Sequence, residues 1–188
     1  MAPKIKVTKE DIIKTTISLV REQGTDSINA RAIALALNCS TQPIFSNFDS
    51  MEELQEKTIL AAYNIYLDFI NKEIQSEKYP KYKSFGMAYI RFAKEEKELF
   101  KLLFMRDRTQ EELGLSPDFE ESVQIIMKAN NLTYPKARLL HFEMWSCVHG
   151  IAVMLATSFL PMEWDLISDV LTDVYQGVLA KHLAEDNV

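Results

Sequence analysis

Glycine, proline and cysteine are all scarce in this chain. Its 188 residues include five glycines, six prolines and two cysteines. Because glycine and proline interrupt helices, their scarcity favours long helices, and no segment shows the alternation that marks a strand. Cys39 and Cys147 lie far apart in apolar company, which argues against a disulfide framework and predicts two small buried side chains in a reducing compartment. The sequence therefore predicts an all-α fold.

The N-terminus also lacks the pattern of a secretory signal. Three lysines within the first nine residues are followed by an amphipathic segment rather than by an apolar run, so we expect a cytoplasmic location. Residues 144–162 carry no charge, and this segment is about long enough to span a membrane as a helix. His149, Gly150 and Pro161 interrupt the segment, so a buried or interfacial helix is the preferred interpretation and no membrane partner is expected.

Positive charge is scarce as well. The net charge is −6, which is unfavourable for a protein that must neutralise DNA phosphates. Residues 1–50 nevertheless hold six basic against five acidic residues, so the acidity belongs to the rest of the chain. This distribution predicts a weakly basic N-terminal surface with modest non-specific affinity, or with a few well-placed bases.

Apolar residues recur at helical spacing along nearly the whole chain, in about nine segments. The predicted helices are residues 8–23, two short helices after the caps Asn29 and Ser40, and residues 50–75, 81–94, 97–105, 117–130, 135–159 and 162–183. The predicted architecture is a three-helix helix-turn-helix head at residues 1–50. The long helix from Ser50 joins it to a helical bundle within residues 51–188, where we expect ligand sensing and dimerisation.

Residues 28–54 have the spacing of a helix-turn-helix motif. Asn29 can cap the first short helix, and four alanines between residues 30 and 36 allow close helix contact. Asn38 stands where the turn requires a positive φ, which asparagine tolerates better than most residues, and Ser40 can cap the next helix. The pattern is typical of a DNA-reading head.

The side chains of the third helix that face away from Ile44 and Phe48 are candidates to enter a DNA groove. Gln42 can pair with an adenine edge, and Thr41 or Pro43 can meet a thymine methyl group. The alternative for each position is an ordinary exposed helix residue. The predicted DNA-binding residues are Lys6, Arg31, Ser40, Thr41, Gln42, Pro43, Phe45, Ser46 and Asn47.

Aromatic residues are plentiful after residue 60. Aromatic walls with one polar handle are typical of small-molecule sites, although aromatic rows at helical spacing are also typical of a plain core, and both interpretations stay open. His141, Trp145 and His149 follow one another at four-residue steps, which favours core histidines over a metal site without further ligands. The candidate pocket for a small apolar or aromatic effector is Tyr63, Tyr66, Phe85, Tyr89, Phe92, Phe104, Trp145 and His149.

The last predicted helix has an apolar stripe too wide for one contact with its own chain. Two such helices from each of two subunits, packed as a four-helix bundle, would cover the excess with two-fold symmetry. We therefore expect a homodimer. The candidate interface residues are Val153, Leu166, Val170, Val174 and Val178.

The head resembles the TetR family of one-component transcriptional regulators over residues 8–60. The matching elements are Gly24, the run from Asn29 to Ala34, Ser40 as a cap, Ile44-Phe45 with Phe48, and Glu52-Glu53-Leu54. Trp145, His149 and Gly150 form a run that resembles the subgroup named after a Trp-His-Gly (WHG) C-terminal domain; residues 89–93 and 98–100 look like the same subgroup. The resemblance implies an all-helical dimer with an operator-binding head and a ligand-sensing body.

Three positions depart from the family's usual pattern. Asn38 replaces the glycine of the turn and keeps its conformation accessible. Phe45 replaces a tyrosine that contacts a phosphate, and Met51 replaces a lysine at the start of the fourth helix. The changes at Phe45 and Met51 remove phosphate contacts. DNA binding should therefore be weaker or should depend more on Arg31 and the N-terminal lysines.

Together these features predict a ligand-responsive regulator, most simply a repressor, that binds double-stranded DNA at a near-palindromic operator. The alternatives are a dimeric interaction protein with a degenerate head, and a constitutive DNA binder whose aromatic body is solid core. No glycine-rich phosphate loop, nucleophile elbow or metalloprotease spacing is present, so no enzyme activity, cofactor or metal is expected.

Overall fold

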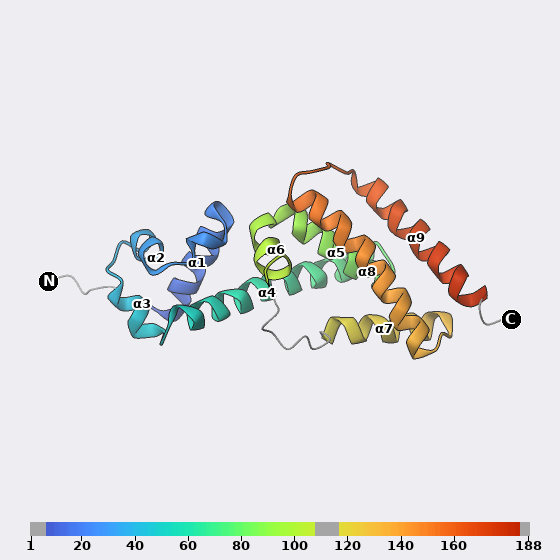
Figure 1. Ribbon diagram of the computed structural model, residues 1–188, viewed down its shortest axis with the longest axis horizontal. Coiled ribbons are helices and arrows are strands. Elements are labelled where there is room, and N and C mark those ends of the chain that lie inside the picture. The colour runs from blue at the N-terminus through green and yellow to red at the C-terminus, as the bar shows by residue number, and fades with distance from the viewer. Residues whose placement is uncertain (1–6, 108–116, 185–188) are drawn as a thin grey trace. The chain divides into compact units, whose positions relative to one another are not determined.

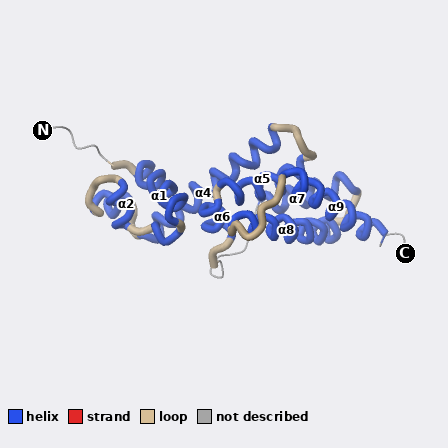
Figure 2. The backbone as a smooth tube through the Cα atoms, turned by 90° about the horizontal axis from the view of Figure 1, so that it is seen from above, coloured by secondary structure: helices blue, strands red, loops and turns tan. Residues whose placement is uncertain are grey.

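The computed structural model describes residues 7–107 and 117–184 of the chain. Within these ranges it contains nine α-helices, one short 3-10 helix and no strand, which confirms the all-α prediction (Figures 1 and 2). The elements are α1 (Lys9–Gln23), η1 (Thr25–Ser27), α2 (Ala30–Ala36), α3 (Gln42–Asn47), α4 (Met51–Gln75), α5 (Lys81–Glu95), α6 (Lys97–Phe104), α7 (Pro117–Asn130), α8 (Tyr134–Ala156) and α9 (Trp164–Ala184).

Side-chain and backbone signals at the helix ends explain where α1 starts and stops. The hydroxyl of Thr8 accepts a hydrogen bond from the Asp11 amide, and the Asp11 carboxylate accepts one from the Thr8 amide, which completes a capping box. Gly24 ends the helix with φ +80° and ψ −173°, a conformation essentially restricted to glycine. A Cβ at this position would also lie 3.2 Å from a carboxylate oxygen of Glu98 on α6.

The end of α8 differs from the sequence-based prediction. The helix stops at Ala156 rather than at residue 159, because Ser158 takes a left-handed conformation with φ +56°. The amides of Ser158 and Phe159 donate to the carbonyls of Leu155 and Met154, which forms a Schellman motif. Helix α9 accordingly begins at Trp164 rather than at residue 162.

The described helices belong to two compact units. The N-terminal unit comprises residues 1–68 and 96–106, and the C-terminal unit comprises residues 69–95 and 107–188. Helix α4 is one uninterrupted helix whose last residues belong to the C-terminal unit (Figure 1). The assignment of α6 to the N-terminal unit was not expected from the sequence, and the functional division predicted after residue 50 stays a prediction.

In the N-terminal unit, α1 packs against α2, α3 and α6. Arg21 on α1 makes two hydrogen bonds to the carboxylate of Glu96, at 2.8 and 2.7 Å, directly before α6. The core beneath the helix-turn-helix motif is Ile12, Leu19, Ile33, Ala34, Ile44, Phe48 and Leu54. This core confirms the predicted inward orientation of Ile44 and Phe48.

In the C-terminal unit, α5 packs along α8, which also contacts α7 and α9 (Figure 1). Gly86 lies at the close approach of these helices, since a Cβ there would be 3.2 Å from Val148 and 3.6 Å from Leu171. Among the described residues, α8 is the one helix with the length and hydropathy of a membrane span, and 39% of its most apolar window is buried inside the protein. Helices of this length and hydropathy also form the cores of soluble proteins.

Neither cysteine forms a disulfide, and the predicted burial of the two side chains is only partial. Cys39 and Cys147 are both free and half-buried. Cys39 follows the turn after α2, where its amide donates to the Ala34 carbonyl. Cys147 lies on α8 beside the exposed Ser146, and its partial burial raises the pKa of its thiol.

Candidate nucleic-acid interface and effector site

The first helix of the helix-turn-helix motif has the predicted start and stop. The Asn29 side chain accepts a hydrogen bond from the Ala32 amide at 2.9 Å and caps α2. Asn38 has φ +51°, and the amide of Cys39 bonds to the Ala34 carbonyl at 2.9 Å, so α2 ends in a Schellman motif. Both sequence-based predictions are confirmed.

The predicted cap of the third helix is wrong. Helix α3 begins at Gln42, and Thr41, not Ser40, precedes it without a side-chain capping bond. The Thr41 carbonyl accepts from the amides of Ile44 and Phe45, at 3.1 and 3.3 Å. The physical reason is Pro43, whose nitrogen carries no hydrogen and therefore gives a Ser40 hydroxyl no amide at the usual position. Ser40 is exposed.

Helix α3 has one buried face and one exposed face. Ile44 is fully buried, while Gln42, Phe45 and Ser46 are exposed and Thr41 and Pro43 are half-buried. The structure thus brings the predicted contact residues of this helix together on one surface, apart from Asn47. Lys6, the remaining N-terminal candidate, lies outside the described residues.

Asn47 has a role that the sequence did not reveal. Its amide nitrogen donates to the carbonyl of Pro43 at 2.7 Å and to the carbonyl of Val7 at 3.4 Å. The side chain is half-buried and ties α3 to the segment before α1. We therefore expect Asn47 to position α3 rather than to read a base. Ser46 donates to the Gln42 carbonyl and keeps its oxygen available as an acceptor.

The basic residues of this surface are unequally available. Lys9 pairs with Glu53 at 3.3 Å and lies 5.0 Å from the Phe48 ring centroid. The Glu53 carboxylate also accepts from the Asp49 amide, and these contacts lower its pKa. Arg31 is exposed and belongs to none of the ion pairs of residues 7–107 and 117–184. Arg31, the one basic residue of α2, therefore has an exposed guanidinium outside these ion pairs.

The eight candidate effector residues fall into the two units. Tyr63, Tyr66 and Phe104 belong to the N-terminal unit, where the Tyr66 ring meets Phe104 edge-on at 5.4 Å and Tyr63 at 5.8 Å. The other five belong to the C-terminal unit: Phe85, Tyr89, Phe92, Trp145 and His149. Pocket membership stays a prediction for each group.

Tyr89 and His149 form a polar pair between α5 and α8. The Tyr89 hydroxyl lies 2.9 Å from Nδ1 of His149, and the imidazole stacks on Trp145 at 5.0 Å with an interplanar angle of 9°. Burial lowers the pKa of His149 and raises that of Tyr89, so both are neutral at pH 7. In the neutral tautomer that carries its hydrogen on Nε2, the imidazole accepts the tyrosine hydrogen at Nδ1; in the other tautomer, Nδ1–H donates to the tyrosine oxygen. Trp145 is 43% exposed, so this stack reaches the surface.

A second tyrosine–histidine pair lies between the same helices and was missed by the sequence reasoning. The Tyr82 hydroxyl lies 2.9 Å from Nδ1 of His141, and the Phe119 ring meets the imidazole edge-on at 4.5 Å. His141 is buried, which confirms the prediction of a satisfied core histidine. Burial lowers the pKa of His141 to about 4. No cluster of potential metal ligands occurs among the residues described by the structure.

The buried His141 predicts a loss of stability in acid. In the unfolded chain its imidazole takes up a proton near pH 6.5, whereas in the folded chain the pKa is about 4. Unfolding therefore binds a proton between these values, and the stability present above pH 6.5 falls by about 2–3 kcal/mol as the pH approaches 4. Urea denaturation at pH 7 and pH 4.5 should show a smaller acid loss for His141→Gln than for the unmodified chain. An equal loss of stability in His141→Gln and in the unmodified chain would show that the acid loss does not come from His141.

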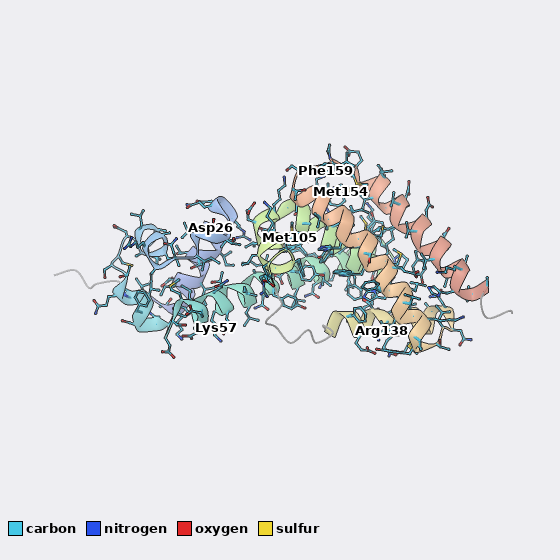
Figure 3. All side chains as sticks on the ribbon, viewed as in Figure 1. Asp26, Lys57, Met105, Arg138, Met154 and Phe159 are labelled. Carbon is cyan, nitrogen blue, oxygen red and sulfur yellow. The ribbon has the colours of Figure 1, made fainter. Side chains whose placement is uncertain are left out.

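One face of α8 and α9 is uncovered in the single chain. Leu166 is 53% exposed, Phe142 is 56% exposed, and the predicted interface valines at 153, 170, 174 and 178 are half-buried. Apart from neighbouring backbone of the same helix, no described atom lies within 4 Å of a Cβ added to Gly150 or Gly177, so both helices leave room for close approach. Phe159, in the turn after α8, is also strongly exposed (Figure 3).

A helix-turn-helix motif with an exposed third helix, followed by a helical unit, is an arrangement typical of DNA-binding transcriptional regulators. A family described as "Tetracyclin repressor-like, C-terminal domain" matches residues 82–185. This match covers more than half of the chain, which therefore belongs to the tetracycline repressor-like (TetR) family of regulators. No curated protein matches the chain. The WHG subgroup suggested by Trp145, His149 and Gly150 stays a prediction.

Proposed function

We propose that this regulator acts as a homodimeric repressor that binds a near-palindromic operator and releases it when a small apolar or aromatic effector binds. The observation that carries DNA binding is the exposed row of Gln42, Phe45 and Ser46 on α3, held outward by the buried Ile44 and Phe48. A short helix presented in this way fits the major groove of DNA.

The uncovered face of α8 and α9 supports the homodimer. Exposed Leu166 and Phe142, with the open backbone at Gly150 and Gly177, would be covered if the same helices of a second copy packed against them. Such an isologous contact carries two-fold symmetry. Two α3 helices could then read half-sites about 34 Å apart, which is one turn of DNA.

The effector response would act through α4, because this helix runs from the motif into the C-terminal unit. Aromatic side chains and the Tyr89–His149 pair supply apolar walls and a polar handle for a ligand. A complete switch from 1:99 to 99:1 between two states requires the ligand to prefer one of them by about 5.5 kcal/mol.

Selection of bound fragments from random DNA by the full chain tests this proposal. We expect an enriched sequence with two inverted half-sites. Gln42→Ala should lose about 1–3 kcal/mol of discrimination at one base pair in each half-site, whereas Glu22→Ala, on an exposed position of α1, should leave the selected sequence unchanged. Enrichment of no sequence would overturn the proposed operator binding.

A lysine at position 51 should strengthen DNA binding and its dependence on salt. Met51 is half-buried at the first residue of α4, where a lysine side chain could reach a phosphate. One additional phosphate contact should steepen the slope of log affinity against log salt by about 0.9. Fluorescence anisotropy of the selected fragment across a salt series measures this slope. The control is Met51→Leu, and an identical slope for lysine and leucine would refute the contact.

A second candidate function is favoured by apolar side chains on the surface of the head. Leu35 on α2 is 82% exposed and Phe45 on α3 is 56% exposed. Exposed apolar residues of this size are more typical of protein contacts than of phosphate contacts. The head would then bind a protein partner rather than DNA, and a failed selection together with unchanged dimerisation would favour this function.

A further inference from the structure

Three side chains from three helices meet in the C-terminal unit. Nε of Arg91 on α5 donates to Oε2 of Glu73 on α4 at 3.0 Å. The same guanidinium lies 4.5 Å from the centroid of the Trp164 ring, at the first residue of α9. Arg91 therefore connects the last part of α4 to the beginning of α9.

The contacts of Arg91 use both properties of a guanidinium. The edge of the group donates to a carboxylate, and its flat face lies over an indole ring, a combination that lysine cannot reproduce. The Glu73 side chain is only 7% exposed, so removing Arg91 alone would leave a nearly buried carboxylate without this ion pair. A second contact supports the same helix pair, since Phe69 on α4 meets Phe92 on α5 edge-on at 5.4 Å.

Lys94 provides a natural comparison. Its ammonium lies 4.7 Å from the same Trp164 ring, one helical turn after Arg91. Lys94 is exposed and makes no ion pair within the described residues. Lys94 therefore contacts α9 without a link to α4. A variant of Lys94 tests the effect of removing a cation from Trp164 while the link through Arg91 stays intact.

We infer that Arg91 is a positioning residue that fixes the end of α4 to the start of α9 and thereby sets which operator spacing the dimer accepts. The inference rests on the proposed function, because it requires a dimer that binds two half-sites. Helix α9 carries much of the proposed dimer face, and α4 continues into the N-terminal unit. A fixed α4 restricts the separations that the two α3 helices can adopt, whereas a loose α4 spreads the population over many separations.

Spacing selectivity is the property that this link should control. The apparent affinity for a given operator is proportional to the fraction of dimers whose two α3 helices already have the separation that this operator requires. A loosened α4 should therefore weaken binding at the preferred spacing and improve relative binding at other spacings. Binding of one head to a single half-site needs no fixed separation and should not change.

The experiment compares the full chain with the double variant Glu73→Met/Arg91→Met on the selected operator and on operators about two base pairs longer or shorter. Removing both charges together avoids an unpaired buried carboxylate. We expect the double variant to lose about ten-fold of spacing discrimination while its affinity for a single half-site stays unchanged. Lys94→Met should keep the full discrimination. Trp164→Leu serves in its place if the double variant does not fold: it removes the α9 end of the link, together with the Lys94 contact that Lys94→Met tests separately, and should give the same loss.

Retained spacing discrimination in a folded double variant, or in Trp164→Leu, would overturn the inference. An equal loss in Lys94→Met would also overturn it, because the effect would then come from charge near Trp164. The proposed function fails in a different way: the unmodified chain would bind no selected fragment, or would bind all spacings equally. Either result would overturn the inference as well.

Discussion

Replacing Phe92 with alanine is expected to lower the free energy of unfolding by about 3–5 kcal/mol, the usual cost of removing a large aromatic side chain from a packed core. Phe92 is completely buried on α5 and meets Phe69 of α4 edge-on. Its loss removes apolar contacts and leaves a cavity that neighbouring helices can fill only in part. Urea denaturation followed by far-ultraviolet circular dichroism measures the change.

Phe45→Ala is the matched control for this prediction. It removes the same atoms from a side chain that is 56% exposed on α3, so the free energy of unfolding should change by no more than about 0.5 kcal/mol. A loss well below 3 kcal/mol for Phe92→Ala would indicate that the surroundings of Phe92 collapse easily. That outcome would favour a deformable effector pocket over solid core at this position.

Local signals made much of the fold predictable. The cap at Asn29 and the positive φ of Asn38 depend on residues within one helical turn, and both match the structure. The cap at Ser40 failed for an equally local reason, since Pro43 removes an amide that capping needs. The end of α8 was predicted three residues too late, because serine, unlike glycine, rarely takes the left-handed conformation that Ser158 adopts there.

The contacts that hold the C-terminal unit together were not predictable from spacing. Helical periodicity indicates which side of a helix is buried but not which helix it meets. Tyr82 and His141 are 59 residues apart, and nothing in the sequence joins them. The predicted aromatic pocket draws on both units, with Tyr66 and Phe104 in one and Tyr89 and Phe92 in the other, and it stays a prediction.

Replacing Arg91 is also expected to lower the folding stability strongly. Arg91→Met should cost about 3 kcal/mol of folding stability, because it leaves the nearly buried carboxylate of Glu73 without its main partner. This value is at the lower end for a broken buried pair, since the Arg91 side chain is 31% exposed and also has a weaker contact with Glu95 at 3.7 Å. Denaturant titration of the single variant measures the loss.

Two further variants separate the charge from the shape of these side chains. Adding Glu73→Met to Arg91→Met should restore most of the stability, because two apolar side chains of similar length need no partner. Glu95→Met alone should change the free energy of unfolding by less than about 1 kcal/mol, since its carboxylate is 51% exposed. If the double variant were as unstable as Arg91→Met, the lost stability would come from the contact of Arg91 with Trp164. The link between α4, α5 and α9 would then depend on the aromatic contact rather than on the ion pair.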